Sequence, residues 1–92
     1  LRAPDEKRLG LTLVAVRTGS LPPGLYVESA AGSALLAGID AGDRIAAVNG
    51  ITVNDPDGFD AAIASLGERA VIALLVSRSG VSMYIPVRRI GR

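Results

Sequence analysis

The sequence contains no cysteine, no histidine and no tryptophan. Without cysteine there is neither a disulfide nor a thiolate-bound metal. Without histidine the commonest general base and the commonest neutral metal ligand are missing, so the serines have no imidazole to activate them. We therefore expect this chain to be no enzyme, and we expect it to hold no metal and to need no cofactor.

Aromatic residues and an excess of one charge are also lacking. Two tyrosines and one phenylalanine are the aromatics, and ten basic residues face nine acidic ones, for a net charge of +1. Surfaces that bind nucleic acid combine clustered basic residues with aromatics that stack on bases. No apolar run approaches the roughly 18 residues of a membrane helix, and no signal-peptide pattern is present. We expect no nucleic-acid partner and no membrane insertion by this chain.

What the sequence does contain is enough apolar residues for one domain. It has 92 residues, of which 49% are hydrophobic, so it is long enough for a single core. The first residue is Leu1 rather than methionine, which predicts a piece of a longer protein. The domain is expected to cover residues 9–88, with 1–8 as the remnant of an N-terminal linker and 89–92 as a C-terminal tail.

Short runs of strand-forming residues alternate with turn signals along most of the chain. The expected strands are 11–16, 25–30, 44–48, 71–78 and 81–88, with a brief extended piece at 51–53. Tight turns are expected at 49–50 (Asn-Gly) and 79–80 (Ser-Gly). Two helices are expected, a short one ending at Gly38 with Ser33 as its N-cap, and a longer one ending at Gly67. This order predicts an α+β fold, a five- to six-stranded antiparallel sheet or partly open barrel flanked by two helices.

Acidic residues lie where turns and helix starts are expected. Asp55 and Asp57 flank Pro56 ahead of the longer helix and are expected to cap it and to complement its N-terminal dipole. An acid/base pair is not expected, because no second catalytic group accompanies them. Asp43, followed by Arg44, is expected to hold a turn.

Gly10 interrupts the apolar pattern at the start of the first strand. Such a glycine indicates a bare backbone that something approaches closely, or a left-handed φ. Taken alone, residues 9–11 (Leu-Gly-Leu) indicate a bulge or turn at a strand edge. In the longer helix, Phe59, Ile63 and Leu66 form one stripe, which favours a core face. Of the three, Leu66 is expected to be the most completely core.

Several of these segments together resemble the PDZ peptide-binding domain. The matching stretches, in order and spacing, are 24–30 (GLYVESA), 32–34 (GSA), 37–39 (AGI), 42–45 (GDRI) and 48–50 (VNG). The order of the elements, with the glycine loop near the N-terminus and a strand at the end, is similar to the circularly permuted bacterial type. Such domains follow the protease domain of HtrA/Deg trypsin-like serine proteases.

The resemblance implies a binding site between the first strand and the longer helix. Residues Leu9, Gly10 and Leu11 stand at the loop that binds a peptide's terminal carboxylate, and Arg8 is expected to add attraction, although Arg8 and Lys7 also read as a solvated pair. The implied groove residues are Thr12, Leu13, Phe59, Ala62, Ile63 and Leu66. By the period-two rule of a strand, Leu9, Leu11 and Leu13 are expected to face the helix side. Phe59 stands where PDZ domains that select serine or threonine carry histidine, which favours an apolar ligand residue instead.

The function implied by the resemblance is recognition of apolar C-terminal tails, or of unfolded protein segments, by strand addition. The expected parent is an HtrA/Deg-type serine endopeptidase in protein quality control, with this chain as its substrate-recognition or regulatory domain and the rest of the protease as a partner. The alternative is a scaffold or assembly PDZ domain of a secretion or envelope complex without a protease. Either parent implies the cell envelope, periplasm or another extracytoplasmic location.

Overall fold

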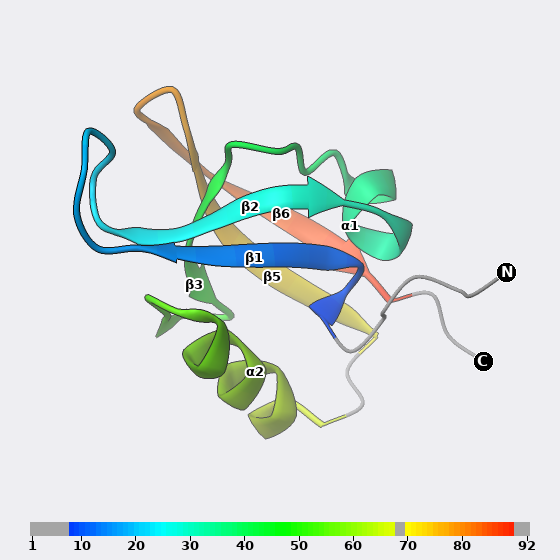
Figure 1. Cartoon of the computed structure of the whole chain (residues 1–92). Helices are drawn as coiled ribbons and strands as arrows, with labels where there is room; N and C mark the ends of the chain where they lie inside the picture. The colour runs from blue at the N-terminus through cyan, green and yellow to red at the C-terminus, as the bar shows by residue number, and fades with distance from the viewer. Residues whose placement is uncertain (1–7, 68–69, 90–92) are drawn as a thin grey trace, which may run out of the picture.

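The computed structural model of the chain describes residues 8–67 and 70–89. These residues form an open antiparallel sheet accompanied by two helices (Figure 1). The elements are, in chain order, β1 (Leu11–Val16), β2 (Gly24–Ala30), α1 (Gly32–Ala37), β3 (Arg44–Val48), β4 (Ile51–Thr52), α2 (Pro56–Ser65), β5 (Val71–Arg78) and β6 (Val81–Arg88). The expected α+β class is confirmed.

The six strands form one sheet in the order β1-β2-β3-β5-β6, and the two-residue β4 pairs with β3 beside this path. Every pairing is antiparallel. The sheet therefore has β1 at one edge and β6 at the other. The β1–β2 pairing shifts register after Thr12, where Thr12 pairs with Ser29 but Leu13 pairs with Val27. A bulge of this kind at a sheet edge bends the strand and re-aims its side chains.

The tight turns form where their sequences predict them. Asn49 and Gly50 have φ values of 47° and 86°, and Ser79 and Gly80 have 52° and 81°. Two successive left-handed residues suit the twist of antiparallel strands, which explains the preference for Asn-Gly at this kind of turn. The two strand pairs β3–β4 and β5–β6 follow from these local conformations.

The helix caps agree with the sequence at three positions and disagree at one. The N–H of Gly58 donates to Asp55 Oδ1 at 2.7 Å, as expected of an N-cap, and Asp57 lies in the first turn of α2. Gly38 ends α1 with a φ of 99°. The prediction that Ser33 caps α1 is wrong, because Ala31 is the N-cap residue and Ser33 lies buried inside the helix.

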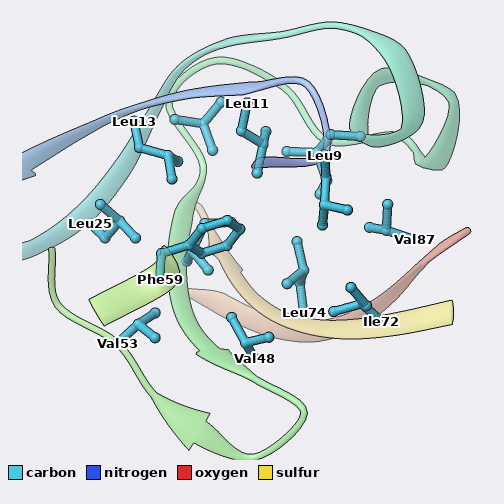
Figure 2. Packing of buried hydrophobic residues seen from close by; sticks show 14 of the residues in the cluster. Leu9, Leu11, Leu13, Leu25, Val48, Val53, Phe59, Ile72, Leu74 and Val87 are labelled. Carbon is cyan, nitrogen blue, oxygen red and sulfur yellow. The ribbon is translucent and has the colours of Figure 1, made fainter. Parts of the chain in front are cut away.

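The core lies between the sheet and α2, and Phe59 is its largest fully buried side chain. Figure 2 shows the Phe59 ring directed from α2 toward leucine and valine side chains of the sheet. The labelled neighbours are Leu9, Leu11, Leu13, Leu25, Val48, Val53, Ile72, Leu74 and Val87. Burying a phenylalanine of this kind is worth about 1.5–3 kcal/mol before any cavity cost is counted.

The two edges of the sheet differ in their capacity to accept a further strand. β6 carries Pro86, paired with Ala73 of β5, and it also contacts α1. Proline has no N–H to donate, so it blunts an edge. β1 contains no proline, and among the described residues β2 is its only strand neighbour. Of the two edges, only the β1 edge has a full set of backbone donors.

Among the residues that the structure describes, Asp43 is the one buried carboxylate, with a side chain only 4% exposed. It accepts hydrogen bonds from Arg78 Nε at 2.8 Å, from Arg78 Nη2 at 2.6 Å and from the N–H of Asp40 at 3.0 Å. The expectation that Asp43 holds the turn after α1 is confirmed, and the same carboxylate also ties this turn to the end of β5. The hydrogen bond from Arg78 lowers the pKa of Asp43, and burial opposes that shift only in part.

We expect Asp43 to make stability depend on pH in the acid range. A carboxyl whose pKa is depressed by folding stabilises the folded state above its ordinary pKa of 3.8 and loses that contribution as the pH falls through the lowered value. Replacing Asp43 by asparagine should lower the free energy of unfolding at pH 7 by about 1.5–3 kcal/mol, the range for a hydrogen bond to a charged group. Urea denaturation of both proteins should show this difference constant from pH 7 to 5 and shrinking below about pH 4.

The matched control is Glu28→Gln, which removes a carboxylate from an exposed position of β2. Its difference from the wild type should stay within about 0.5 kcal/mol. A difference for Asp43→Asn that does not change between pH 5 and pH 3 contradicts the assignment.

Candidate functional site

The candidate site lies between the open edge of β1 and helix α2. Figure 1 shows β1 bordered by β2 on one side and by α2 on the other. Because β2 is the only strand paired with β1 within residues 8–67 and 70–89, the second row of backbone N–H and C=O groups of β1 faces the α2 side. An edge with this arrangement offers a peptide a template for strand addition.

Side chains alternate along the loop and β1 as the period of a strand requires. Leu9, Leu11 and Leu13 are 0%, 4% and 7% exposed and belong to the core, whereas Thr12 is exposed on the opposite face. The expectation that the leucines face the helix side is confirmed. The side chain of Thr12, a predicted groove residue, therefore points away from the core.

Helix α2 presents Phe59, Ala62 and Ile63 to the same region, and all three are buried in the core. Leu66 is only partly buried, so the expectation that it is the most completely core of the stripe is wrong. The physical reason is that α2 ends at Ser65 and Leu66 is its C-cap residue, where the chain leaves the core. In this conformation the side chains proposed for a ligand pocket pack mainly on one another.

The Leu9–Gly10 loop that precedes β1 is docked on the start of α1. Leu9 and Gly10 have left-handed φ values of 59° and 86°. The N–H of Ala34 donates to the Leu9 carbonyl, and the N–H of Ala31 donates to the Gly10 carbonyl, both at 2.9 Å. The two carbonyl oxygens, which would repel an anion, are therefore committed to α1.

Gly10 is required by this docking. A Cβ atom at Gly10 would lie 2.0 Å from the carbonyl oxygen of Ala31 and 2.6 Å from its carbon, far inside van der Waals contact. The left-handed φ expected at Gly10 is confirmed. The close approach comes from the protein's own backbone, an explanation that the sequence could not supply because Ala31 is distant in the chain.

Arg8 reaches across from this loop to α2. Its Nε donates to Asp60 Oδ1 and its Nη2 to Asp60 Oδ2, each at 2.8 Å. Both side chains are 30% exposed. The two parallel hydrogen bonds form the bidentate geometry that suits a guanidinium and a carboxylate. Nothing in the sequence signals this pair, because 52 positions separate its members and each lies within an ordinary polar pattern.

A second, looser ion pair lies at the far end of β1. Arg17 Nη2 is 3.8 Å from Asp55 Oδ2, with side chains 74% and 39% exposed. A shallow hollow beside it is lined by Val16, Arg17, Pro23, Gly24 and Asn54. The space between β1 and α2 is thus flanked at both ends by an arginine on the β1 side and an aspartate on the α2 side.

Other kinds of site find no support in the part of the chain that the structure describes. Within residues 8–67 and 70–89, no group of three or more acidic, histidine or cysteine side chains is placed to hold a metal ion. Over those same residues, no helix has both the length and the apolar character to span a membrane. Lys7 lies outside the described residues.

Comparison with known proteins identifies the fold. No protein-family model matches the sequence, and no curated protein matches it. Solved structures, in contrast, match most of the chain. The PDZ domain of EpsC from Vibrio cholerae superposes with a TM-score of 0.67 at 22% identity, covering 91% of this chain and 98% of that one.

A second similar structure is the PDZ domain of the pullulanase C protein of the type II secretion system from Klebsiella pneumoniae, solved in complex with a fatty acid. It gives a TM-score of 0.63 at 26% identity, with 85% of this chain and 82% of that one covered. The chain therefore has the PDZ fold, as the resemblance implied. The two similar structures are both PDZ domains.

The docking of the loop on α1 predicts that Gly10→Ala is far more harmful than a glycine substitution of equal φ elsewhere. The left-handed φ alone costs about 1 kcal/mol. The clash with Ala31 adds to it, so we expect Gly10→Ala to lower the free energy of unfolding by about 3 kcal/mol or more. Urea denaturation followed by circular dichroism measures both variants.

The control is Gly50→Ala, because Gly50 has the same φ of 86° and no atom within 4 Å of the position a Cβ would take. It should cost only the conformational part, about 1 kcal/mol. Equal losses in the two variants show that the close approach to Ala31 is unimportant.

Proposed function

We propose that this domain binds peptide segments of partner proteins by strand addition along β1, as a recognition or assembly module of a secretion or envelope complex. The observation that carries the proposal is the unpaired edge of β1 beside α2, at the end of a sheet whose other edge is blunted by Pro86. Backbone hydrogen bonds to such an edge supply affinity, and alternate side chains of the added strand supply specificity.

The proposal places the terminal carboxylate of a peptide at the loop formed by Leu9, Gly10 and Leu11. Several converging N–H donors make an anion site in such a turn. The commitment of the Leu9 and Gly10 carbonyls to α1 supports this placement, since it takes two acceptor oxygens away from an incoming anion. We therefore expect a peptide with a free C-terminal carboxylate to bind more tightly than the same peptide with an amidated C-terminus.

The last side chain of the peptide would enter between β1 and α2, near Leu11, Ile63 and Leu66. Because Leu11 and Ile63 are buried, an incoming side chain must displace Ile63 or Leu66, or move α2 outward. Burying an apolar side chain there returns about 1.5–3 kcal/mol. With the charge-assisted hydrogen bonds and the ordering costs, we expect a net of about −6 to −8 kcal/mol, the micromolar range.

The parent protein that best fits the comparisons is a secretion or envelope component. The similar structures are PDZ domains of EpsC and of a type II secretion protein, which favours the assembly alternative over an HtrA/Deg protease. We accordingly propose an envelope or periplasmic setting. The fatty acid in the pullulanase C structure is also an apolar chain with a terminal carboxylate, so a fatty acid serves as a competitor in the binding test.

The test is titration of the domain with fluorescent heptapeptides that end in valine or leucine, each as the free acid and as the amide. We expect micromolar binding of the acids and about 10- to 100-fold weaker binding of the amides, the equivalent of one charge-assisted hydrogen bond. In ¹⁵N-resolved spectra, backbone signals of the loop and of β1 should shift on titration.

The β6 edge is the internal control, and its amide signals should stay unchanged. Shifts confined to β6, or binding of acid and amide with equal affinity, contradict capture of the carboxylate by residues 9–11. Absence of any binding at millimolar peptide and fatty acid contradicts the proposed function itself.

A further inference from the structure

We infer that Asp60 is an internal competitor for the ligand's carboxylate: it occupies Arg8 in the free domain and sets how strongly the site prefers a free chain end. The inference rests on the proposed function and concerns the same site. It starts from the bidentate pair of Arg8 with Asp60, whose two hydrogen bonds are both 2.8 Å long.

The position of the pair makes it part of the site. Arg8 immediately precedes the Leu9–Gly10 loop, whose backbone is held by α1, and Asp60 lies on α2 next to Phe59. The guanidinium therefore spans from the loop to the helix, the two walls between which a peptide end would lie. A carboxylate bound at residues 9–11 becomes a second acceptor within reach of the same guanidinium.

Arg8 cannot give the same two hydrogen bonds to both carboxylates. Asp60 takes the fork made by Nε and Nη2, so a ligand carboxylate must either displace Asp60 from that fork or accept from the Nη1 side of a guanidinium whose charge Asp60 already balances. In the free domain Asp60 also neutralises the charge of Arg8, which reduces its attraction for an incoming anion. The preference for a free carboxylate is consequently lower than the loop and Arg8 alone would give.

The ion pair at the opposite end of β1 shows what a pair without this role looks like. Arg17 and Asp55 are 3.8 Å apart at their nearest atoms, and Arg17 is 74% exposed. An exposed pair of that kind contributes little. The Arg8–Asp60 pair is short, bidentate and more than two-thirds shielded from solvent, which makes it a real competitor.

The test measures the ratio of the dissociation constants of the amidated and the free-acid peptide. Four proteins are compared: wild type, Asp60→Asn, Arg8→Gln and the double variant. Asp60→Asn should raise the ratio about three- to fivefold, the range for a partly shielded ion pair. Arg8→Gln should lower it, and in the Arg8→Gln background the asparagine substitution should raise the ratio much less than in the wild type, because only the direct repulsion between Asp60 and the ligand is then removed.

The matched control is Asp57→Asn, which removes the same charge from an exposed position of the same helix. Its ratio should equal that of the wild type. Thermal melts establish that each variant is folded.

A second measurement uses the wild-type protein alone. In the wild-type protein, the side-chain ¹³C signal of Asp60 and the Nε signal of Arg8 should shift with the free-acid peptide and stay in place with the amide.

The outcomes separate this inference from the proposed function. If no peptide binds to any of the proteins, the proposed function fails. If peptides bind with a preference for the free acid but Asp60→Asn leaves the ratio unchanged, the competitor role is overturned. It is overturned equally if Asp60→Asn raises the ratio as much in the Arg8→Gln background as in the wild type, or if the Arg8 and Asp60 signals stay in place with the free acid.

Discussion

The contact between the backbones of Gly10 and Ala31 is the constraint on which the site depends. Two hydrogen bonds from the start of α1 hold the loop carbonyls, and the absence of a Cβ at Gly10 lets the chains meet. This docking fixes where β1 begins and places Leu9 in the core. It also fixes the backbone position from which the Arg8 side chain extends. The direction of the β1 edge and the reach of Arg8 toward α2 both follow from one close approach.

Most of the fold was predictable because its signals are local. The Asn49-Gly50 turn, the Asp55 cap and the alternation of leucines along β1 each depend on neighbouring residues, and the structure confirms them. The PDZ motifs added the resemblance to a known fold, and the solved structures confirm that fold. Ser33 failed as a cap because the helix begins two residues earlier than its sequence suggests, with Ala31 as the N-cap.

Contacts between side chains far apart in the sequence were not predictable in the same way. The Arg8–Asp60 and Asp43–Arg78 pairs join positions 52 and 35 residues apart. The sequence contains other arginines and aspartates that could have formed such ion pairs equally well. Leu66 was misplaced because the helical stripe continues past the point where the helix ends. The predicted groove residues Phe59 and Ile63 are core residues, so a ligand that enters beside them must perturb the packing that stabilises the domain.

Pro86 has a consequence for how many copies of a partner such a domain can join. A sheet with two open edges can pair at both and pass strand pairing from one molecule to the next, which is the route to fibrous polymers. Here one edge carries a proline and contacts α1, and the other is open. A strand added to β1 therefore ends the series on this molecule. If the domain binds by strand addition as proposed, its one open edge would take a single partner strand, and binding would not pass strand pairing on to further molecules.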